Sequence, residues 1–223
     1  MSSLPLFPLG TVLFPGLVLP LHVFEERYRA LVRHLVALPD GTPREFGVVA
    51  IQRGWEVDQH AGAALTLYEI GCTAQVRQVT EHPDGRFDLT TVGTRRFAIR
   101  GIDAESRPYL VAEVEWLEES VGRPGEADRL MPTVLDLFQR YLRLVRPAQL
   151  GEQVPEDPTV LSHLIAATAA LSLAERHSLL AMPDTVARLR AERVILGREV
   201  ALLGRVRAVP VPLSELAVSN SPN

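Results

Sequence analysis

The sequence predicts an α+β fold in which a small, closed or half-closed β-barrel with one early helix precedes a C-terminal bundle of α-helices. Up to residue 117 the apolar residues fall mainly in short runs separated by Pro, Gly and Asp-Gly turns, as in the strands of a barrel. After residues 122–125, which read GRPG, apolar residues recur every three or four positions, as on helices. We therefore expect a β domain over residues 1–121, a helical subdomain over 122–204 and an extended or frayed tail over 205–223.

The opening segment, residues 4–28, reads LPLFPLGTVLFPGLVLPLHVFEERY and shapes the entry into the barrel. Its four prolines and two glycines are incompatible with a signal peptide or a long regular helix. Apolar runs predict strands at 4–7 and 11–14, turns at 8–10 and at Pro15-Gly16, and extended chain over 17–21. A helix then opens at Glu25, with an apolar stripe formed by Phe24, Tyr28, Leu31, Val32 and Leu35.

Further strands follow this helix. Residues 46–51 form a continuous apolar run, which predicts a strand buried on both faces. The segment 82–86, HPDGR, predicts a hairpin that pairs 87–92 with 74–80, because Asp-Gly readily adopts the positive φ angles of a tight turn. We also expect a loop over 54–64, strand character over 65–79, a bend over 93–97 and strands over 97–102 and 109–117.

The helical part carries clear start signals. An apolar stripe from Leu130 to Leu144 predicts a long helix that ends before Pro147. Asp157-Pro158 predicts an N-cap followed by a first-turn proline, Ser172 and Glu175 match a capping box, and Asp184 caps the last helix. One side of that helix is expected to carry Val186, Leu189, Arg193, Leu196, Val200 and Leu203.

Composition indicates a globular protein, and we expect it in the cytoplasm. The hydrophobic fraction of 47% is sufficient for a packed core, and no apolar run approaches the roughly 20 residues that cross a bilayer. Neither export nor membrane contact is expected. The single cysteine, Cys72, lies in an apolar run, so we expect a core residue in a reducing compartment. The net charge of −4 argues against a dedicated nucleic-acid binder.

The sequence shows no recognisable catalytic or metal-binding motif. All 23 basic residues are arginine, so these residues contain no Schiff-base lysine, Ser–Lys peptidase dyad or P-loop lysine. The six histidines are scattered, without the spacing of zinc ligands. The acid pairs Glu25-Glu26 and Glu118-Glu119 are explained by the helix dipole and by a solvated strand end. We expect no enzyme activity, no cofactor and no metal site.

Several segments, in order, resemble the N-terminal substrate-binding domain of Lon proteases. They are LPLFPLGTVLFPGLVLPLHVFEERYRAL, FGVVAI, LYEIGCTAQV, the Asp-Gly hairpin, VGTRRF and, before the last helix, ALSLAERHSLLAMPD. The resemblance implies a PUA-like β pseudo-barrel and a helical bundle that together recognise unfolded or tagged polypeptide. The matched segments do not include the Lon ATPase and Ser–Lys peptidase domains. The resemblance therefore implies a free-standing, non-catalytic substrate-binding protein.

Burial of a client's apolar side chains in a groove is the first functional hypothesis. The candidate lining residues are Leu13, Phe14, Leu17, Phe24 and Tyr28, with Glu25, Glu26 and Arg27 at the rim. Each apolar candidate also fits an alternative role in the barrel core. Expected partners are unfolded or apolar polypeptide segments, with a separate protease as a further candidate. The identity of the client and the oligomeric state, including a homo-oligomer, are left open.

RNA binding is the alternative hypothesis, because PUA-like barrels are also used on RNA. The phosphate contacts would come from Arg86, Arg95, Arg96 and Arg100, and affinity should fall steeply with salt. Neighbours in a strand point to opposite faces, so Arg95 and Arg96 share one surface only if a bend redirects them. Nucleic acid is therefore the weaker candidate partner.

Overall fold

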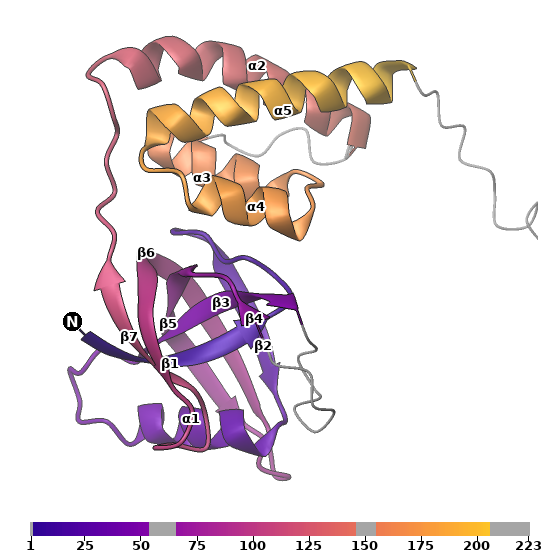
Figure 1. The fold of residues 1–223 in the computed structure, drawn as a ribbon. Helices are drawn as coiled ribbons and strands as arrows, with labels where there is room; N and C mark the ends of the chain where they lie inside the picture. The colour runs from indigo at the N-terminus through magenta and orange to yellow at the C-terminus, as the bar shows by residue number, and fades with distance from the viewer. Residues whose placement is uncertain (1, 54–65, 146–154, 206–223) are drawn as a thin grey trace, which may run out of the picture.

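The computed structural model describes residues 2–53, 66–145 and 155–205, in which a β-barrel carries a layer of helices at one end (Figure 1). This mixed architecture confirms the predicted α+β class. The strands are β1 (Ser2–Leu9), β2 (Val18–Val23), β3 (Glu45–Arg53), β4 (Thr66–Leu67), β5 (Ile70–Glu81), β6 (Phe87–Asp103) and β7 (Val111–Trp116). The helices are α1 (Glu26–Val36), α2 (Glu126–Val145), α3 (Pro158–Thr168), α4 (Leu173–Leu180) and α5 (Thr185–Arg205).

Five strands close into a ring in the order β1-β7-β6-β5-β3, and β3 pairs back to β1. Closure depends on β1, which changes partner half-way along its length. Residues 2–5 pair antiparallel with β7, whereas residues 6–9 pair in parallel with β3. β2 and β4 extend the sheet by pairing with β6 and β3. The turn predicted at 8–10 is wrong, because pairing with β3 keeps Pro8 and Leu9 in the strand.

The ring of Phe97 fills the interior of this barrel. Phe97 is fully buried in a cluster with Leu4, Leu6, Val49, Ala112 and Val114. A Cβ atom at Gly47 would lie 2.7 Å from Cζ of Phe97, and a Cβ at Gly71 would lie 2.5 Å from it. The aromatic ring therefore occupies the space that side chains at these two positions would need.

The opposite face of the same strands packs against α1. Phe7 of β1 stacks on Tyr28 of α1 with ring centroids 4.0 Å apart, and the cluster includes Cys72. The predicted burial of Cys72 is confirmed, and burial raises its pKa to about 12. Residues 46–51 are all buried, as expected of a strand with two covered faces. Phe24 does not belong to the α1 stripe, because it precedes the helix and is 53% exposed.

The opening segment docks on an irregularity in β6. The bend predicted over 93–97 is a β-bulge inside one continuous strand, since Cys72 pairs with Arg96 whereas Ala74 pairs with Gly93. The amide of Gly16 donates to the carbonyl of Gly93, and the amide of Gly93 donates to the carbonyl of Leu17, both at 2.8 Å. Residues 11–14 are therefore not the predicted strand, because their backbone lies over the bulge instead of pairing in the sheet.

The predicted β5–β6 hairpin is confirmed, with residues 87–92 opposite 75–81. Its turn needs only one positive φ angle, 77° at Gly85, and not one at Asp84 as well. The side chain of Asp84 instead accepts a hydrogen bond from the Arg86 amide at 3.1 Å.

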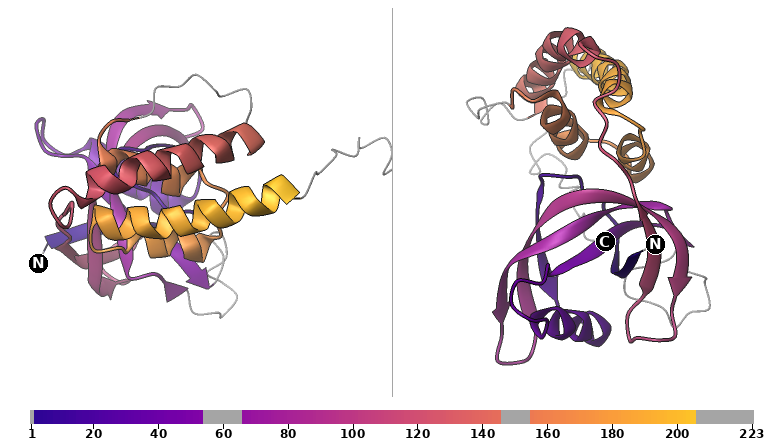
Figure 2. Two further views of the ribbon diagram at one scale, coloured as in Figure 1. Left: turned by 90° about the horizontal axis from the view of Figure 1, so that it is seen from above. Right: turned by 90° about the vertical axis from the view of Figure 1, so that its left-hand side faces the viewer.

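Helices α2, α3, α4 and α5 form two layers over one end of the barrel, whereas α1 lies at the other end (Figure 1). α2 and α5 run side by side on the outside, with α3 and α4 beneath them (Figure 2). The Asp157 N-cap and the Ser172–Glu175 capping box are confirmed. Asp184 accepts from the Ala187 amide at 2.7 Å, as expected of a cap for α5. Of the residues predicted to share one side of α5, Arg193 is exposed, whereas the neighbouring Glu192 is buried.

A small apolar cluster joins the helices to the barrel. Val12, Phe14 and Ala50 from the barrel side pack with Ala166 of α3 and with Leu179 and Leu180 at the end of α4. The predicted division at residues 121 and 122 stays a prediction. It falls between β7, which ends at Trp116, and α2, which begins at Glu126. The predicted loop over 54–64 and the tail over 206–223 lie outside the described residues.

Gly47→Ala is expected to lower the free energy of unfolding by about 1–3 kcal/mol, because the added methyl group overpacks the barrel interior. Urea denaturation measures this change. The control, Gly197→Ala in α5, has nothing within 4 Å of the new Cβ and should stabilise the protein by about 0.5–1 kcal/mol. Phe97→Leu should lower the free energy of unfolding by less in the Gly47→Ala variant than in the wild type, because the smaller side chain makes room for the added methyl group. An equal loss of unfolding free energy in the two backgrounds would show that the methyl group added at Gly47 does not meet the Phe97 ring.

Candidate functional site

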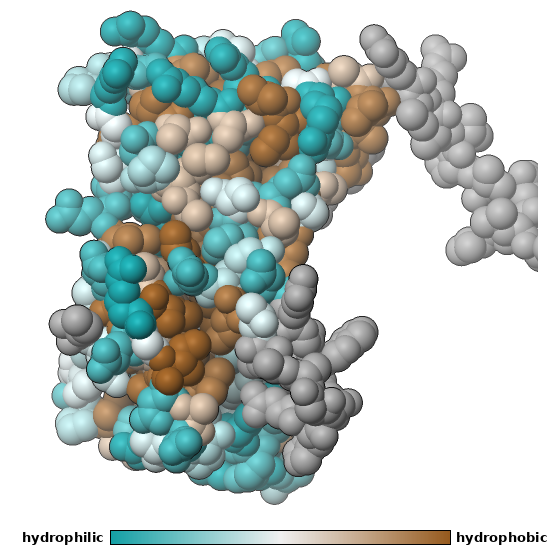
Figure 3. All heavy atoms as spheres, in the orientation of Figure 1, coloured by the Kyte–Doolittle hydropathy of each residue, from teal (hydrophilic) through white to brown (hydrophobic). Residues whose placement is uncertain are grey.

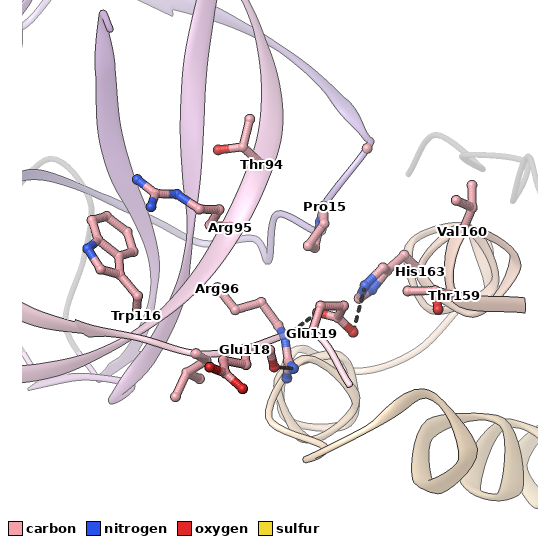
Figure 4. Close-up of a pocket in the computed structure, with 12 residues that line it drawn as sticks. Pro15, Thr94, Arg95, Arg96, Trp116, Glu118, Glu119, Thr159, Val160 and His163 are labelled. Carbon is pink, nitrogen blue, oxygen red and sulfur yellow. Dashed lines mark hydrogen bonds and ion pairs between the residues drawn. The ribbon is translucent and has the colours of Figure 1, made fainter. Parts of the chain in front are cut away.

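A cavity of about 470 Å³ opens between the barrel and α3 (Figure 4). The barrel supplies the Pro15-Gly16 turn, residues 94–96 of β6 and the chain from Trp116 to Glu119. Thr159, Val160 and His163 of α3 form the facing wall. The cavity therefore lies where the opening segment, the β6 bulge and the helical layer meet.

One wall is an aromatic and cationic pair. The guanidinium carbon of Arg95 lies 3.9 Å from the centre of the Trp116 ring, which is a cation–π geometry. Arg95 also donates to Glu45 at 3.2 Å, and its side chain is 54% exposed. This wall presents an apolar ring together with a charge that solvent can reach.

The next residue, Arg96, points the other way and is 2% exposed. Its Nη1 donates to the carbonyls of Leu180 and Met182 at 2.8 and 2.6 Å, at the end of α4. Its Nε donates to Glu119 at 2.8 Å. A barrel arginine thus caps the carboxyl end of a helix in the other part of the molecule.

Glu119 connects this arginine to the helices. Its other oxygen accepts from Arg188 of α5 at 2.6 Å and lies 3.5 Å from Nε2 of His163. Arg188 is fully buried and also donates to Ser162 at 3.3 Å. We call Arg96, Glu119, His163 and Arg188 the ion cluster. Arg96 and Glu119 form the floor of the cavity and His163 belongs to its α3 wall. Together with Arg188 they link β6, the chain after β7, α3 and α5.

The charges in the ion cluster follow from its surroundings. Partial burial raises the pKa of Glu119, but His163, Arg188 and Arg96 outweigh this effect and lower it to about 2. Burial lowers the pKa of His163 below its ordinary value, so the ring is neutral at pH 7. Burial also raises the pKa of Glu192, near Arg188, well above its ordinary value. Glu119 is therefore the carboxylate that neutralises the two buried arginines.

The structure separates the predicted groove residues. Leu13, Phe14 and Tyr28 are at most 5% exposed, so in this structure they lie in the core, which is the alternative role that the sequence left open. Leu17 is half-buried and Phe24 is exposed. At the predicted rim, Glu25 pairs with Arg27 at 2.7 Å, whereas Glu26 pairs with Arg29 and Arg33. A binding role for the accessible residues stays a prediction.

The four arginines proposed for RNA do not form one patch. Arg86 pairs with Asp84, Arg95 with Glu45 and Arg100 with Glu115. Arg96 is buried in the ion cluster, so phosphate cannot reach it. The alternation of strand faces sends Arg95 and Arg96 to opposite sides, as the sequence argument anticipated.

A protein-family model described as the ATP-dependent protease La (LON) substrate-binding domain matches residues 3–198. The chain belongs to this family. The match covers the barrel and helices α2, α3 and α4, together with most of α5. The resemblance predicted from the opening segment and the later strands is confirmed.

Relatives of this LON substrate-binding domain include Lon protease 2 of Herpetosiphon aurantiacus, 31% identical over 90% of this chain and 24% of the relative. Lon protease of Escherichia coli is 26% identical over 90% of this chain and 25% of its own length. The chain thus spans about a quarter of the length of these relatives.

Two solved structures resemble the domain. The Lon N-terminal domain protein from Xanthomonas campestris has a TM-score of 0.59 and 29% identity, and the match covers 85% of this chain and 96% of that one. The N-terminal domain of a Mycobacterium avium complex Lon protease has a TM-score of 0.65 at 21% identity, covering 90% and 98%. The second likeness supports the fold alone.

The cavity of this LON domain uses residues that the sequence argument did not select, notably Trp116, Val160 and His163. The sequence predicts a solvated strand end at Glu119, whereas the structure shows that Glu119 anchors the ion cluster. No local signal marks Glu119, because its partners Arg96 and Arg188 lie 23 and 69 positions away along the chain. Within the described residues, no helix is long and apolar enough to cross a membrane.

Glu119→Gln is expected to destabilise the protein by about 2–4 kcal/mol, because it leaves two buried guanidinium groups without their carboxylate. The lower half of this range allows for solvent screening, since the Glu119 side chain is 32% exposed. Urea denaturation at pH 7 measures the change. Glu118→Gln is the control, because its side chain belongs to none of the ion pairs found among the described residues. A loss of stability equal to that of Glu119→Gln would refute the assignment.

Stability should fall as the pH drops from 7.5 to 5.5. His163 has a lowered pKa in the folded state, so its neutral form contributes fully above the ordinary value of 6.5, and protonation below that value favours unfolding. His177, whose pKa burial also lowers, acts in the same direction. Urea denaturation across this range should therefore show a smaller loss for His163→Gln than for the wild type. Parallel losses would exclude His163 as a source.

Proposed function

We propose that this LON substrate-binding domain holds segments of protein substrates in the cavity between the barrel and α3, without a catalytic step of its own. The single observation that carries the proposal is this cavity, which combines apolar and polar walls in a domain of a substrate-binding family. A volume near 470 Å³ falls within the range of typical ligand pockets, with room for a few side chains of an extended segment.

The walls suit a polypeptide. Pro15, Trp116 and Val160 offer apolar surface, and Val160 is 47% exposed on the first turn of α3. Burying a client's apolar side chain there would contribute roughly 25 cal/mol per Å² before ordering costs. Thr94, Arg95 and Glu118 supply polar groups at the edge that can hydrogen-bond a main chain or side chains.

Apolar side chains also reach the surface of the barrel outside the cavity (Figure 3), and Trp116 takes part in both surfaces. Leu67, Ile99 and Leu110, together with Trp116, pack on the interior cluster and are only partly buried. This surface gives a bound segment apolar contacts beyond the cavity.

Val160→Glu should weaken binding of a fluorescently labelled, unfolded apolar peptide about tenfold or more, as measured by anisotropy. Loss of one buried aliphatic contact is worth about 1.5 kcal/mol or more, which corresponds to tenfold. An acidic residue in the first turn of a helix is compatible with folding. Val194→Glu, on an exposed position of α5, is the matched control and should bind as the wild type does.

The accessible residues of the opening segment are the second candidate surface. If Phe24→Ser weakens binding and Val160→Glu does not, the site lies at Leu17, Phe24 and the Glu25–Arg27 pair instead of the cavity. Absence of saturable binding by the wild type would overturn the function itself.

Cooperation with a protease, a cytoplasmic location and the oligomeric state stay predictions. The relatives are proteases by name, and their remaining three quarters are not represented in this chain. RNA binding has no observation in its favour, because each of its candidate arginines is paired with a carboxylate.

A further inference from the structure

Two histidines and an aspartate meet on the barrel near the β5–β6 turn. Nδ1 of His22 lies 2.6 Å from Oδ1 of Asp88, and Nε2 of His82 lies 2.6 Å from Oδ2 of the same carboxylate. The three ligand atoms lie within 4.8 Å of one another. This group is separate from the cavity and the ion cluster, none of whose residues it shares.

Strand register produces this meeting. His22 of β2 is the direct cross-strand partner of Asp88 in β6, so their side chains share a face. On the other side of β6, Thr80 pairs with Asp88, and His82 lies two residues further along the chain. The amide of His82 donates to the carbonyl of Arg86 at 2.8 Å, which holds that histidine at the start of the turn. Positions 22, 82 and 88 therefore converge although 66 residues separate the first from the last.

The arginines near Asp88 form their close contacts with other acceptors, so the carboxylate of Asp88 contacts the two imidazole rings. Arg86 pairs with Asp84, and Arg29 donates to the carbonyl of Gly85 at 2.7 Å, so these nearby cations are held by other acceptors. The side chains of His22, His82 and Asp88 are 48%, 37% and 51% exposed. Solvent and ions can therefore reach all three side chains.

We propose that His22, His82 and Asp88 bind a divalent first-row transition metal, with Zn²⁺ as the reference ion. Two imidazole nitrogens and one carboxylate oxygen suit Zn²⁺, Co²⁺ and Ni²⁺, whereas Mg²⁺ and Ca²⁺ prefer oxygen-only sites. Tetrahedral ligand atoms with bonds of about 2 Å lie roughly 3.3 Å apart. The histidine–carboxylate contacts, now 2.6 Å, must therefore open by about 0.7 Å, which exposed side chains allow, and water completes the coordination.

The spacing of the histidines along the chain predicts no metal site. Such spacing does not show which residues lie next to one another on neighbouring strands. A metal here would connect β2 to the β5–β6 hairpin next to the exposed Phe24, whose ring centroid lies 6.3 Å from that of His22. Metal binding should consequently raise the melting temperature.

Calorimetric titration of the EDTA-treated, dialysed protein with ZnCl₂ tests the proposal. The wild type should bind one equivalent at this site, and His22→Ala or His82→Ala should weaken that binding about tenfold or more. His34→Gln, which removes a histidine of α1 outside the cluster, should bind as the wild type does. MgCl₂ should give no comparable binding.

Two further measurements guard against misfolding. Circular dichroism checks that each variant is folded, and Asp88→Asn, which keeps the shape of the side chain, should weaken zinc binding without unfolding the barrel. Visible absorption of bound Co²⁺ reports its ligands directly and should be lost in His82→Ala. Absence of zinc binding by the wild type, or wild-type affinity in both folded histidine variants, would overturn the proposal.

Discussion

The burial of Arg96 is the constraint on which the union of the barrel and the helices depends. A guanidinium group that is almost fully removed from water must find charged and carbonyl partners, or the fold loses several kcal/mol. Arg96 finds them in Glu119 and at the end of α4. The strand cannot satisfy the guanidinium donors of Arg96 alone, and the helix cannot satisfy the last carbonyl groups of α4 alone. Their hydrogen bonds therefore fix the position of the barrel and the helices relative to each other.

The β6 bulge determines where the side chain of Arg96 points. It changes the register between Cys72 and Ala74, and it provides the glycine against which the opening segment packs. The same stretch sends Arg96 toward the end of α4 and places Arg95 against Trp116. One local irregularity thereby places the turn at Pro15-Gly16, the floor of the cavity and its aromatic wall.

The tightly packed barrel interior and the residues that can contact a partner lie in different parts of the structure. Phe97, between two glycines, makes the barrel interior intolerant of added volume, whereas the residues that can meet a partner lie at its surface. The cavity faces the helical layer, and the histidine–aspartate cluster lies on different strands near the β5–β6 turn. A closed barrel can carry two such surfaces, because its strands already satisfy their backbone hydrogen bonds within the sheet.

The sequence by itself determined the α+β class, the helix caps at Asp157 and Ser172, the Asp-Gly hairpin and the family, because each rests on local spacing or on ordered motifs. It could not distinguish groove from core at Phe14 and Tyr28, since apolar side chains suit both. Only the tertiary structure decided that Glu119 neutralises two buried arginines and that His22 and His82 share one carboxylate. Those contacts join residues far apart in the chain, and strand register and helix docking, not local propensity, bring them together.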